Sequence, residues 1–273
     1  MTLTAPTNSD SIKIARASVS PSARDLCFFL ADYSSWLLGS GATCIRMEKN
    51  MKRIASSYGM DVETTIMPRH IHMTVWRPGT DERFTYIAGV SHCGIDFSIN
   101  TSLSELSWEI ADGRADFASA KVKFQKIISE PRSNPWLVLL LVTIANASFC
   151  RLFGGDFVAM GVVAIATFAG FFLKQRMMAR KIDVRVIVMV CAFVSSVLGA
   201  TAMLFSLGST PSIAIATSVL YLVPGIPFLN SFSDMLYRHY ICAYSRMVDT
   251  LVLTACLSIG LCCGMLLMNA NMF

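Results

Sequence analysis

The sequence predicts a mainly α-helical membrane protein, with five transmembrane helices preceded by a small α+β cytoplasmic domain. Of its 273 residues, 54% are hydrophobic and only 15% are charged, whereas soluble domains carry about 25% charged residues. The charges are also unevenly placed, with 15 Lys/Arg and 14 Asp/Glu in residues 1–133 but only 8 and 4 in residues 134–273. The second half is instead built from long apolar runs. These three observations exclude an ordinary soluble globule and a disordered chain.

The same distribution gives the expected domain organisation. Residues 1–20 are expected to be a flexible N-terminus, and they contain no apolar core of the kind found in a signal peptide. Residues 21–133 are expected to form the cytoplasmic α+β domain, and residues 134–273 the transmembrane domain. The nine cysteines are odd in number and show no CxxC spacing, so we expect buried thiols and no disulfide framework.

The cytoplasmic domain is predicted to be two helices, a small sheet and two more helices. Apolar residues recur at helical spacing over 26–37 and 47–58, and they alternate over 62–66, 71–75 and 84–88, which is typical of strands. A further helix is expected to open at the capping box formed by Ser102 and Glu105, and a last one covers 117–128.

This domain shows little sign of catalytic or metal chemistry. His70 and His72 share one strand face, but a zinc site needs four ligands placed together, so we expect no metal and no cofactor. Gly39-Ser-Gly41 lacks the Lys-Ser/Thr pair of a phosphate-binding loop. No nucleophile and base occur in a recognisable pattern, and the basic residues are not interleaved with aromatics as in nucleic-acid-binding proteins. We therefore expect neither an enzyme nor a nucleic-acid partner.

Five apolar stretches in the second half are each close to the ~20 residues that cross a bilayer as a helix. Helices are expected because backbone groups in lipid must bond within their own segment. Gly154, Gly155 and Asp156 leave room only for a tight hairpin between the first two. The stretches run over 136–153, 157–173, 186–207, 212–229 and 248–268.

A basic loop between the second and third stretches sets the expected topology. It contains Lys174, Arg176, Arg180, Lys181 and Arg185, and short loops rich in Lys and Arg stay in the cytoplasm. In a multi-pass protein of the cell (inner) membrane, the N-terminal domain and a loop over 230–247 would then be cytoplasmic. The C-terminus would lie on the outer side.

The fourth stretch is interrupted by Pro224, Gly225 and Pro227. Each proline removes a backbone donor and disturbs the helical hydrogen bonds. A broken helix in lipid is tolerated where it is packed in protein or lines a wet cavity, as in the substrate sites of secondary transporters. The alternative is a helix that ends at Leu222, with the Pro-Gly-Ile-Pro segment as its connecting turn. The two interpretations stay open here.

Charged residues follow this break and flank the fifth stretch. Asp234 and Arg238 are four apart, and Arg246 and Asp249 three apart, so either pair could meet on one helix face. Such residues at a membrane boundary indicate functional candidates, and the alternative is an interfacial loop anchored by its charges. Together with the break, they form the candidate substrate and ion pathway: Pro224, Gly225, Pro227, Asn230, Asp234, Arg246 and Asp249.

Glycines mark candidate helix contacts. Gly260 and Gly264 form a GxxxG pattern, which allows two helices to approach closely. Gly154 and Gly155 of the predicted hairpin belong to the same group of helix-packing candidates.

The residues also resemble a known family. The segment Gly41–Glu48 (GATCIRME), which contains Arg46, is similar to the opening motif of the threonine/serine exporter family (ThrE, YjjP-like). The hairpin at 154–156 and the block from Leu222 to Arg246 resemble that family too, and the likeness covers about residues 22–268. Gly41, Arg46 and Glu48 are the motif positions in the cytoplasmic domain.

The resemblance implies more than the residue patterns do. Full-length members fuse this half to a second membrane half, so this chain resembles the split arrangement that a small YjjB-like membrane subunit completes. The resemblance implies export of threonine and serine by the proton gradient, or of succinate by the split pair. Expected partners are membrane lipid, the second subunit or further copies of the chain, protons and a small carboxylate-bearing substrate.

Two classes of function remain. The leading hypothesis is a subunit of a proton-coupled secondary exporter, in which Arg246 holds a substrate carboxylate and Asp234 or Asp249 carries the coupling proton. The rival is a membrane-anchored regulatory or scaffold protein whose cytoplasmic domain binds a partner. A tether has no need for the Pro-Gly break, so the break separates the two hypotheses.

Overall fold

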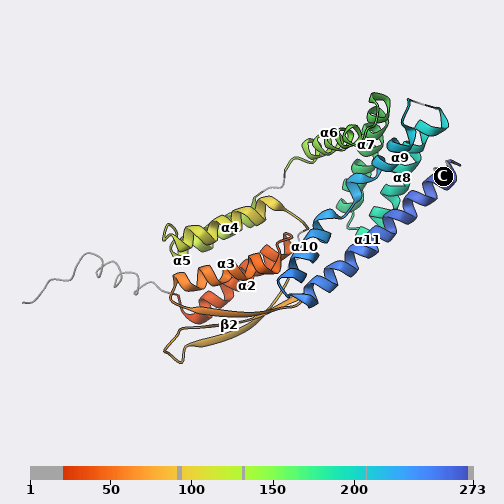
Figure 1. Ribbon diagram of the computed structural model, residues 1–273. Coiled ribbons are helices and arrows are strands. Elements are labelled where there is room, and N and C mark those ends of the chain that lie inside the picture. The colour runs from red at the N-terminus through yellow and green to blue at the C-terminus, as the bar shows by residue number, and fades with distance from the viewer. Residues whose placement is uncertain (1–20, 91–93, 131–132, 207, 270–273) are drawn as a thin grey trace, which may run out of the picture. The chain divides into compact units, whose positions relative to one another are not determined.

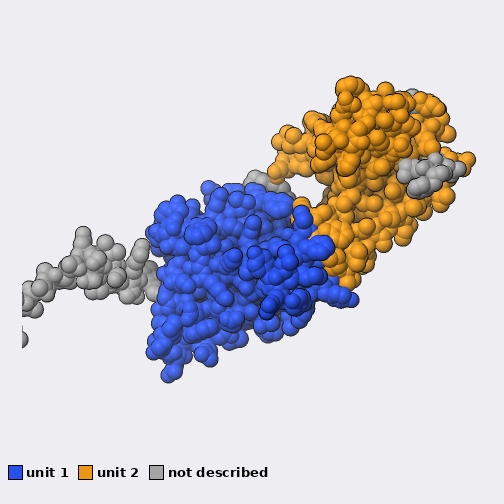
Figure 2. All heavy atoms as spheres, viewed as in Figure 1, with its two compact units in different colours: residues 1–130, 229–246 blue, residues 131–228, 247–273 orange. Residues whose placement is uncertain are grey.

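The computed structural model of the chain describes residues 21–90, 94–130, 133–206 and 208–269. The predicted flexible segment 1–20 and the C-terminal residue Phe273 lie outside these ranges. The chain forms two compact units, one of residues up to 130 together with 229–246, and one of residues 131–228 and 247–273 (Figure 2). Residues 229–246, which the sequence analysis counted with the transmembrane domain, thus pack with the α+β part of the chain.

Over the described residues 21–90 and 94–130, the first unit contains four helices and an antiparallel sheet, as the sequence predicted (Figure 1). The sheet has the order β1-β2-β3. Ile71, Met73 and Val75 alternate inward from the central strand and are buried, which confirms the expected period of two. The elements are α2 (Ala23–Gly39), α3 (Cys44–Ser57), β1 (Asp61–Ile66), β2 (His70–Trp76), β3 (Arg83–Gly89), α4 (Phe97–Ala111) and α5 (Phe117–Ser129).

The predicted start of the third helix is wrong. Helix α4 begins at Phe97 because the side chain of Asp96 caps it, accepting hydrogen bonds from the N–H groups of Ser98 and Ile99. An aspartate at this position satisfies donors that have no partner within the helix. Ser102 lies inside the helix, so the Ser102–Glu105 pattern is not a capping box.

The prediction of a loop over 230–247 is also wrong, because most of this segment is helical. Helix α10 (Gly225–Leu236) continues well past the apolar stretch, and α11 (Tyr240–Leu267) begins only a few residues later. The 28 residues of α11 amount to about 42 Å at 1.5 Å per residue, which exceeds the ~30 Å of hydrocarbon. Its first two turns can therefore lie outside the lipid. Residues 229–246 are called the α10–α11 hairpin below.

The second unit is built from the apolar helices. They are α6 (Pro135–Leu152), α7 (Phe157–Ala179), α8 (Val184–Leu204), α9 (Pro211–Ser218), the short 3-10 helix η1 (Leu220–Leu222) and the remainder of α11. Four helices in the described part of the chain are long and apolar enough to cross a membrane, or up to five if the bent pair of α9–η1 and α10 is one span. The protein is therefore a mainly helical multi-pass membrane protein.

A capped hairpin joins α6 to α7. Gly154 adopts φ +89°, a left-handed conformation that favours glycine. Asp156 caps α7 through the N–H of Ala159 and accepts from the N–H and the hydroxyl of Ser209 in the loop before α9. The Asp156 carboxylate therefore links the turn between α6 and α7 to the loop before α9.

Candidate functional site

The break in the bent helix pair is short. Val223 and Pro224 lie between η1 and α10, and the helix resumes at Gly225 with a bend of 61°. Pro227 lies in the first turn of α10, where a backbone N–H has no acceptor inside the helix, so the proline costs no helical hydrogen bond. The chain thus continues as a helix directly after Pro224.

Asp234 is fixed in the first unit by the backbone of a distant helix. Its side chain is 0% exposed, and its Oδ1 accepts a hydrogen bond of 2.8 Å from the N–H of Cys44, the first residue of α3. Thr43, at the N-cap position, makes no side-chain capping bond. The carboxylate therefore supplies the acceptor and the negative charge that the N-terminus of a helix favours.

Arg246 completes this arrangement from α11. Its Nη1 lies 2.9 Å from Oδ2 of Asp234, and its Nη2 donates to the carbonyl of Ala42 at 3.0 Å. A buried carboxylate needs such a partner, because an isolated charge inside a protein costs several kcal/mol. Arg246 therefore binds an internal carboxylate in this structure.

The turn before α3 receives a second side chain from α10. The amide of Asn230 donates to the carbonyl of Gly41 at 2.8 Å. Gly41 has φ +91°, and a Cβ there would come within 3.1 Å of the Ile95 side chain, so both backbone and space favour glycine. Three predicted pathway residues thus meet the predicted Gly41 motif, a relationship that the sequence analysis did not foresee.

The other two motif positions also make contacts within the first unit. Arg46 donates to Oδ1 of Asn100 on α4 at 2.8 Å. Glu48 lies 3.7 Å from Nε2 of His239, in the turn between α10 and α11. The motif residues therefore connect α3 to α4 and to the α10–α11 hairpin.

Asp249 is separate from this cluster. It belongs to the second unit, and its exposed carboxylate lies 4.0 Å from Nη2 of Arg185. Neither of the two predicted pairs, Asp234 with Arg238 and Arg246 with Asp249, is among the ion pairs found in the described ranges. Asp234 and Arg246 pair with each other instead.

The predicted packing glycines contact their surroundings closely. A Cβ on Gly260 would collide with the carbonyl oxygen of Met189 on α8, and one on Gly264 would lie 2.7 Å from Oγ of Ser196. The GxxxG face therefore packs against α8 of the same chain. In the α6–α7 hairpin, a Cβ on Gly155 would lie 2.5 Å from the sulfur of Cys150.

A layer of polar side chains near the middle of the apolar helices was not predicted from the sequence. Asn146 on α6, 3% exposed, donates to Oγ1 of Thr167 on α7 at 2.6 Å and to the carbonyl of Thr217 at 3.1 Å. Ser195 on α8 is 2.9 Å from the hydroxyl of Tyr221, which lies just before the break. The signal was weak, because these few polar residues show no recognisable spacing pattern within the apolar runs.

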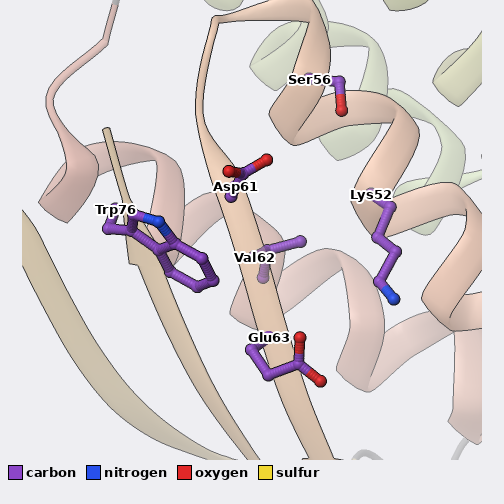
Figure 3. A pocket seen from close by; sticks show the side chains of 6 residues that line it. All are labelled: Lys52, Ser56, Asp61, Val62, Glu63 and Trp76. Carbon is purple, nitrogen blue, oxygen red and sulfur yellow. The ribbon is translucent and has the colours of Figure 1, made fainter. Parts of the chain in front are cut away.

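A pocket of about 220 Å³ lies on the first unit, between α3 and the sheet edge. Figure 3 shows Asp61, Val62 and Glu63 following one another along β1, with Trp76 on one side and Lys52 and Ser56 on the other. The charged side chains that line it are exposed to water. No group of three or more His, Cys, Asp or Glu residues with metal-binding geometry occurs in the described ranges.

A bundle of apolar helices with a bent helix pair and an internal polar layer is a construction found in membrane transporters. The comparisons with known proteins agree. Residues 29–268 match the family described as "Putative threonine/serine exporter" (ThrE), and the chain belongs to this family.

Two relatives share the name "Probable succinate transporter subunit YjjP". The protein from Klebsiella aerogenes is 29% identical over 243 residues, which is 88% of this chain and 92% of the relative. The protein from Escherichia coli strain K12 is 27% identical over 228 residues, or 82% and 88%. No solved structure matches the chain.

Proposed function

We propose that this chain is one subunit of a proton-coupled secondary exporter of small carboxylate-bearing metabolites. The substrate is threonine or serine, or succinate when a YjjB-like membrane subunit completes the transporter. Membership of the exporter family and the names of the two relatives support a transporter role. The observation that carries the proposal is the 61° break at Val223–Pro224 inside a membrane-capable helix pair.

The break supports transport because it interrupts the regular helical hydrogen bonds inside an apolar segment. Val223 and Pro224 lie outside the helices. The N–H of Val223 donates to the carbonyl of Leu220, and the carbonyls of Val223 and Pro224 accept from the N–H groups of Gly225 and Phe228. Non-helical backbone of this kind is stable in a membrane where it contacts protein or water, and in secondary transporters it contributes to ion and substrate sites. A helix that only anchors a domain gains nothing from this interruption.

We assign the coupling proton to Asp234 or Asp249 and the contact with a substrate carboxylate to Arg246. In the structure Arg246 is paired with Asp234. Protonation of Asp234 would neutralise the carboxylate and leave the guanidinium available for the carboxylate of a substrate. Proton binding and substrate binding would then be linked through one arginine. On this proposal the first unit faces the cytoplasm and the C-terminus lies outside, in keeping with the basic segment 174–185.

The test is efflux from cells that express the chain with its YjjB-like subunit and are loaded with labelled threonine, serine or succinate. The variant Pro224→Leu/Gly225→Ala favours a continuous helix and is expected to abolish efflux while the protein still inserts. Asp234→Asn should remove the dependence of efflux on the pH gradient. Unchanged efflux in the double variant would favour the rival, a membrane-anchored scaffold.

A further inference from the structure

We propose that the second unit contains its own carboxylate-binding site, formed by Lys174 with the hydroxyls of Tyr221 and Ser195. This inference rests on the proposed function, because it names where the exported metabolite binds within the apolar helices. It differs from the contact assigned to Arg246, which belongs to the first unit.

The site begins with one face of α7. Thr167, Gly170 and Lys174 follow one another at spacings of three and four residues, so they lie along one side of the helix. Thr167 bonds to Asn146, and Gly170 faces the Ser195–Tyr221 pair. Lys174 is the charged member of this strip, and it lies in a helix that is long and apolar enough to cross a membrane. An ionisable residue in such a helix is a functional candidate.

Gly170 provides the space for the two hydroxyls. A Cβ at this position would collide with the oxygens of Tyr221 and Ser195. In contrast, a Cβ on Gly161 of the same helix has no atom within 4 Å. The close approach at Gly170 lets the hydroxyls of η1 and α8 lie beside α7.

Aromatic contacts connect Lys174 to the Tyr221 ring. Its Nζ lies 5.6 Å from the ring centre of Phe171, and the Phe171 ring packs edge-on against Tyr221 with the centres 6.0 Å apart. A single phenylalanine therefore separates the ammonium group from the Tyr221 ring. Tyr221 itself lies two residues before the break at Val223–Pro224, so movement at the break would displace its hydroxyl.

The chemistry of these groups fits a carboxylate. The ammonium supplies charge, and the Tyr221 and Ser195 hydroxyls can donate hydrogen bonds once they are separated from each other. The Asn146–Thr167 pair lies two turns from Lys174, about 10 Å along α7 at 1.5 Å per residue. A second polar group of the metabolite could bond there. The site therefore favours a short molecule with a carboxylate at one end and a polar group at the other.

The experiment measures KM and maximal rate of uptake into inverted membrane vesicles that contain the chain and its YjjB-like subunit, because export from the cytoplasmic side fills such vesicles; succinate, threonine and serine are separate substrates. Lys174→Gln is expected to raise KM about tenfold or more, because a charge-assisted contact is lost. Lys174→Arg should retain most of the affinity. Arg176→Gln is the matched control, since this exposed residue of α7 carries the same charge outside the strip.

A second pair of variants tests the geometry. Gly170→Ala should impair efflux because the added methyl group would collide with the hydroxyls of Tyr221 and Ser195. Gly161→Ala should leave efflux unchanged. If the wild type transports and Lys174→Gln keeps the wild-type KM, Lys174 only anchors the helix at the membrane surface, and the inference is overturned. If the wild type transports none of the three substrates, the proposed function fails first.

Discussion

The carboxylate of Asp234 accepts a hydrogen bond from the backbone N–H of Cys44, 190 residues earlier in the chain. The bond fixes the end of α10 to the first residue of α3, and Arg246 neutralises the same carboxylate. Helix α3, which precedes the apolar helices in the sequence, and the α10–α11 hairpin, which follows most of them, are thereby joined inside one compact unit. The α10–α11 hairpin is therefore an integral part of the α+β unit.

Removal of this carboxylate is expected to destabilise the first unit strongly. Asp234→Ala leaves the guanidinium of Arg246 without its carboxylate and the N-terminus of α3 without its acceptor. Breaking a buried ion pair from one side costs about 3–5 kcal/mol. Thermal unfolding of the purified protein measures the loss. Asp249→Ala is the control, because its carboxylate is exposed; an equal fall in Tm for both variants would contradict the buried pair.

Cys44 is expected to resist alkylation in the folded protein. The neighbouring Cys242 thiol, burial and the Asp234 carboxylate all raise the pKa of the Cys44 thiol above its usual value. Little thiolate then exists at neutral pH, and the thiolate is the form that reacts. Iodoacetamide labelling at pH 8, followed by peptide mass spectrometry, should modify Cys44 only after denaturation in detergent. Rapid labelling of the native protein would show that the hairpin leaves α3.

The contact between α8 and α11 is expected to tolerate no side chain at Gly260. An added methyl group meets the carbonyl of Met189, and backbone cannot move aside as a flexible side chain can. Gly260→Ala should therefore cost about 1–3 kcal/mol, the usual range for an overpacked interior. The comparison is Gly225→Ala, where a Cβ has no atom within 4 Å. Equal Tm values for the two variants would rule out the tight contact.

Asp156 gives the second unit a defined pH dependence. Hydrogen bonds from the backbone N–H groups of Ala159 and Ser209 hold the pKa of Asp156 below its ordinary value of 3.8. The stabilisation is therefore fully present above the ordinary pKa and is lost as the pH falls through the lower, folded-state value. The difference in Tm between wild type and Asp156→Asn should be constant from neutral pH to about pH 5 and shrink below about pH 4. A difference that stays constant at pH 3 would disprove this assignment.

The sequence was sufficient where the cause of structure is local. Alternating apolar residues predicted the three strands, and Pro224 with Gly225 marked the interruption of the fourth apolar stretch, because proline acts on its own backbone. The start of α4 was missed, since Ser102 matched a capping pattern while Asp96 made the actual cap. Several residue patterns can nominate a cap, and only the hydrogen bond decides between them.

Contacts between segments that are far apart in the sequence leave no pattern in the residues around them. The positions of Asn230, Asp234 and Arg246 in the sequence indicated a membrane boundary, yet their partners lie in the turn at residues 41–44. The polar layer was missed for a related reason. Ser195 and Asn146 can be recognised as part of it only when helix packing brings a hydrogen-bond partner to each. Lys174 was counted with the basic loop, although it belongs to the body of α7.

The small-residue face of α11 has a consequence for assembly. Because Gly260 and Gly264 are already covered by α8, that groove is closed to a companion subunit. Broad side chains project instead from α6, where Leu140, Leu141 and Ile144 are each more than half exposed. A neighbouring protein in the bilayer would have to displace lipid tails from these bulky residues. It would then bind through complementary side-chain shape rather than through close approach of two backbones.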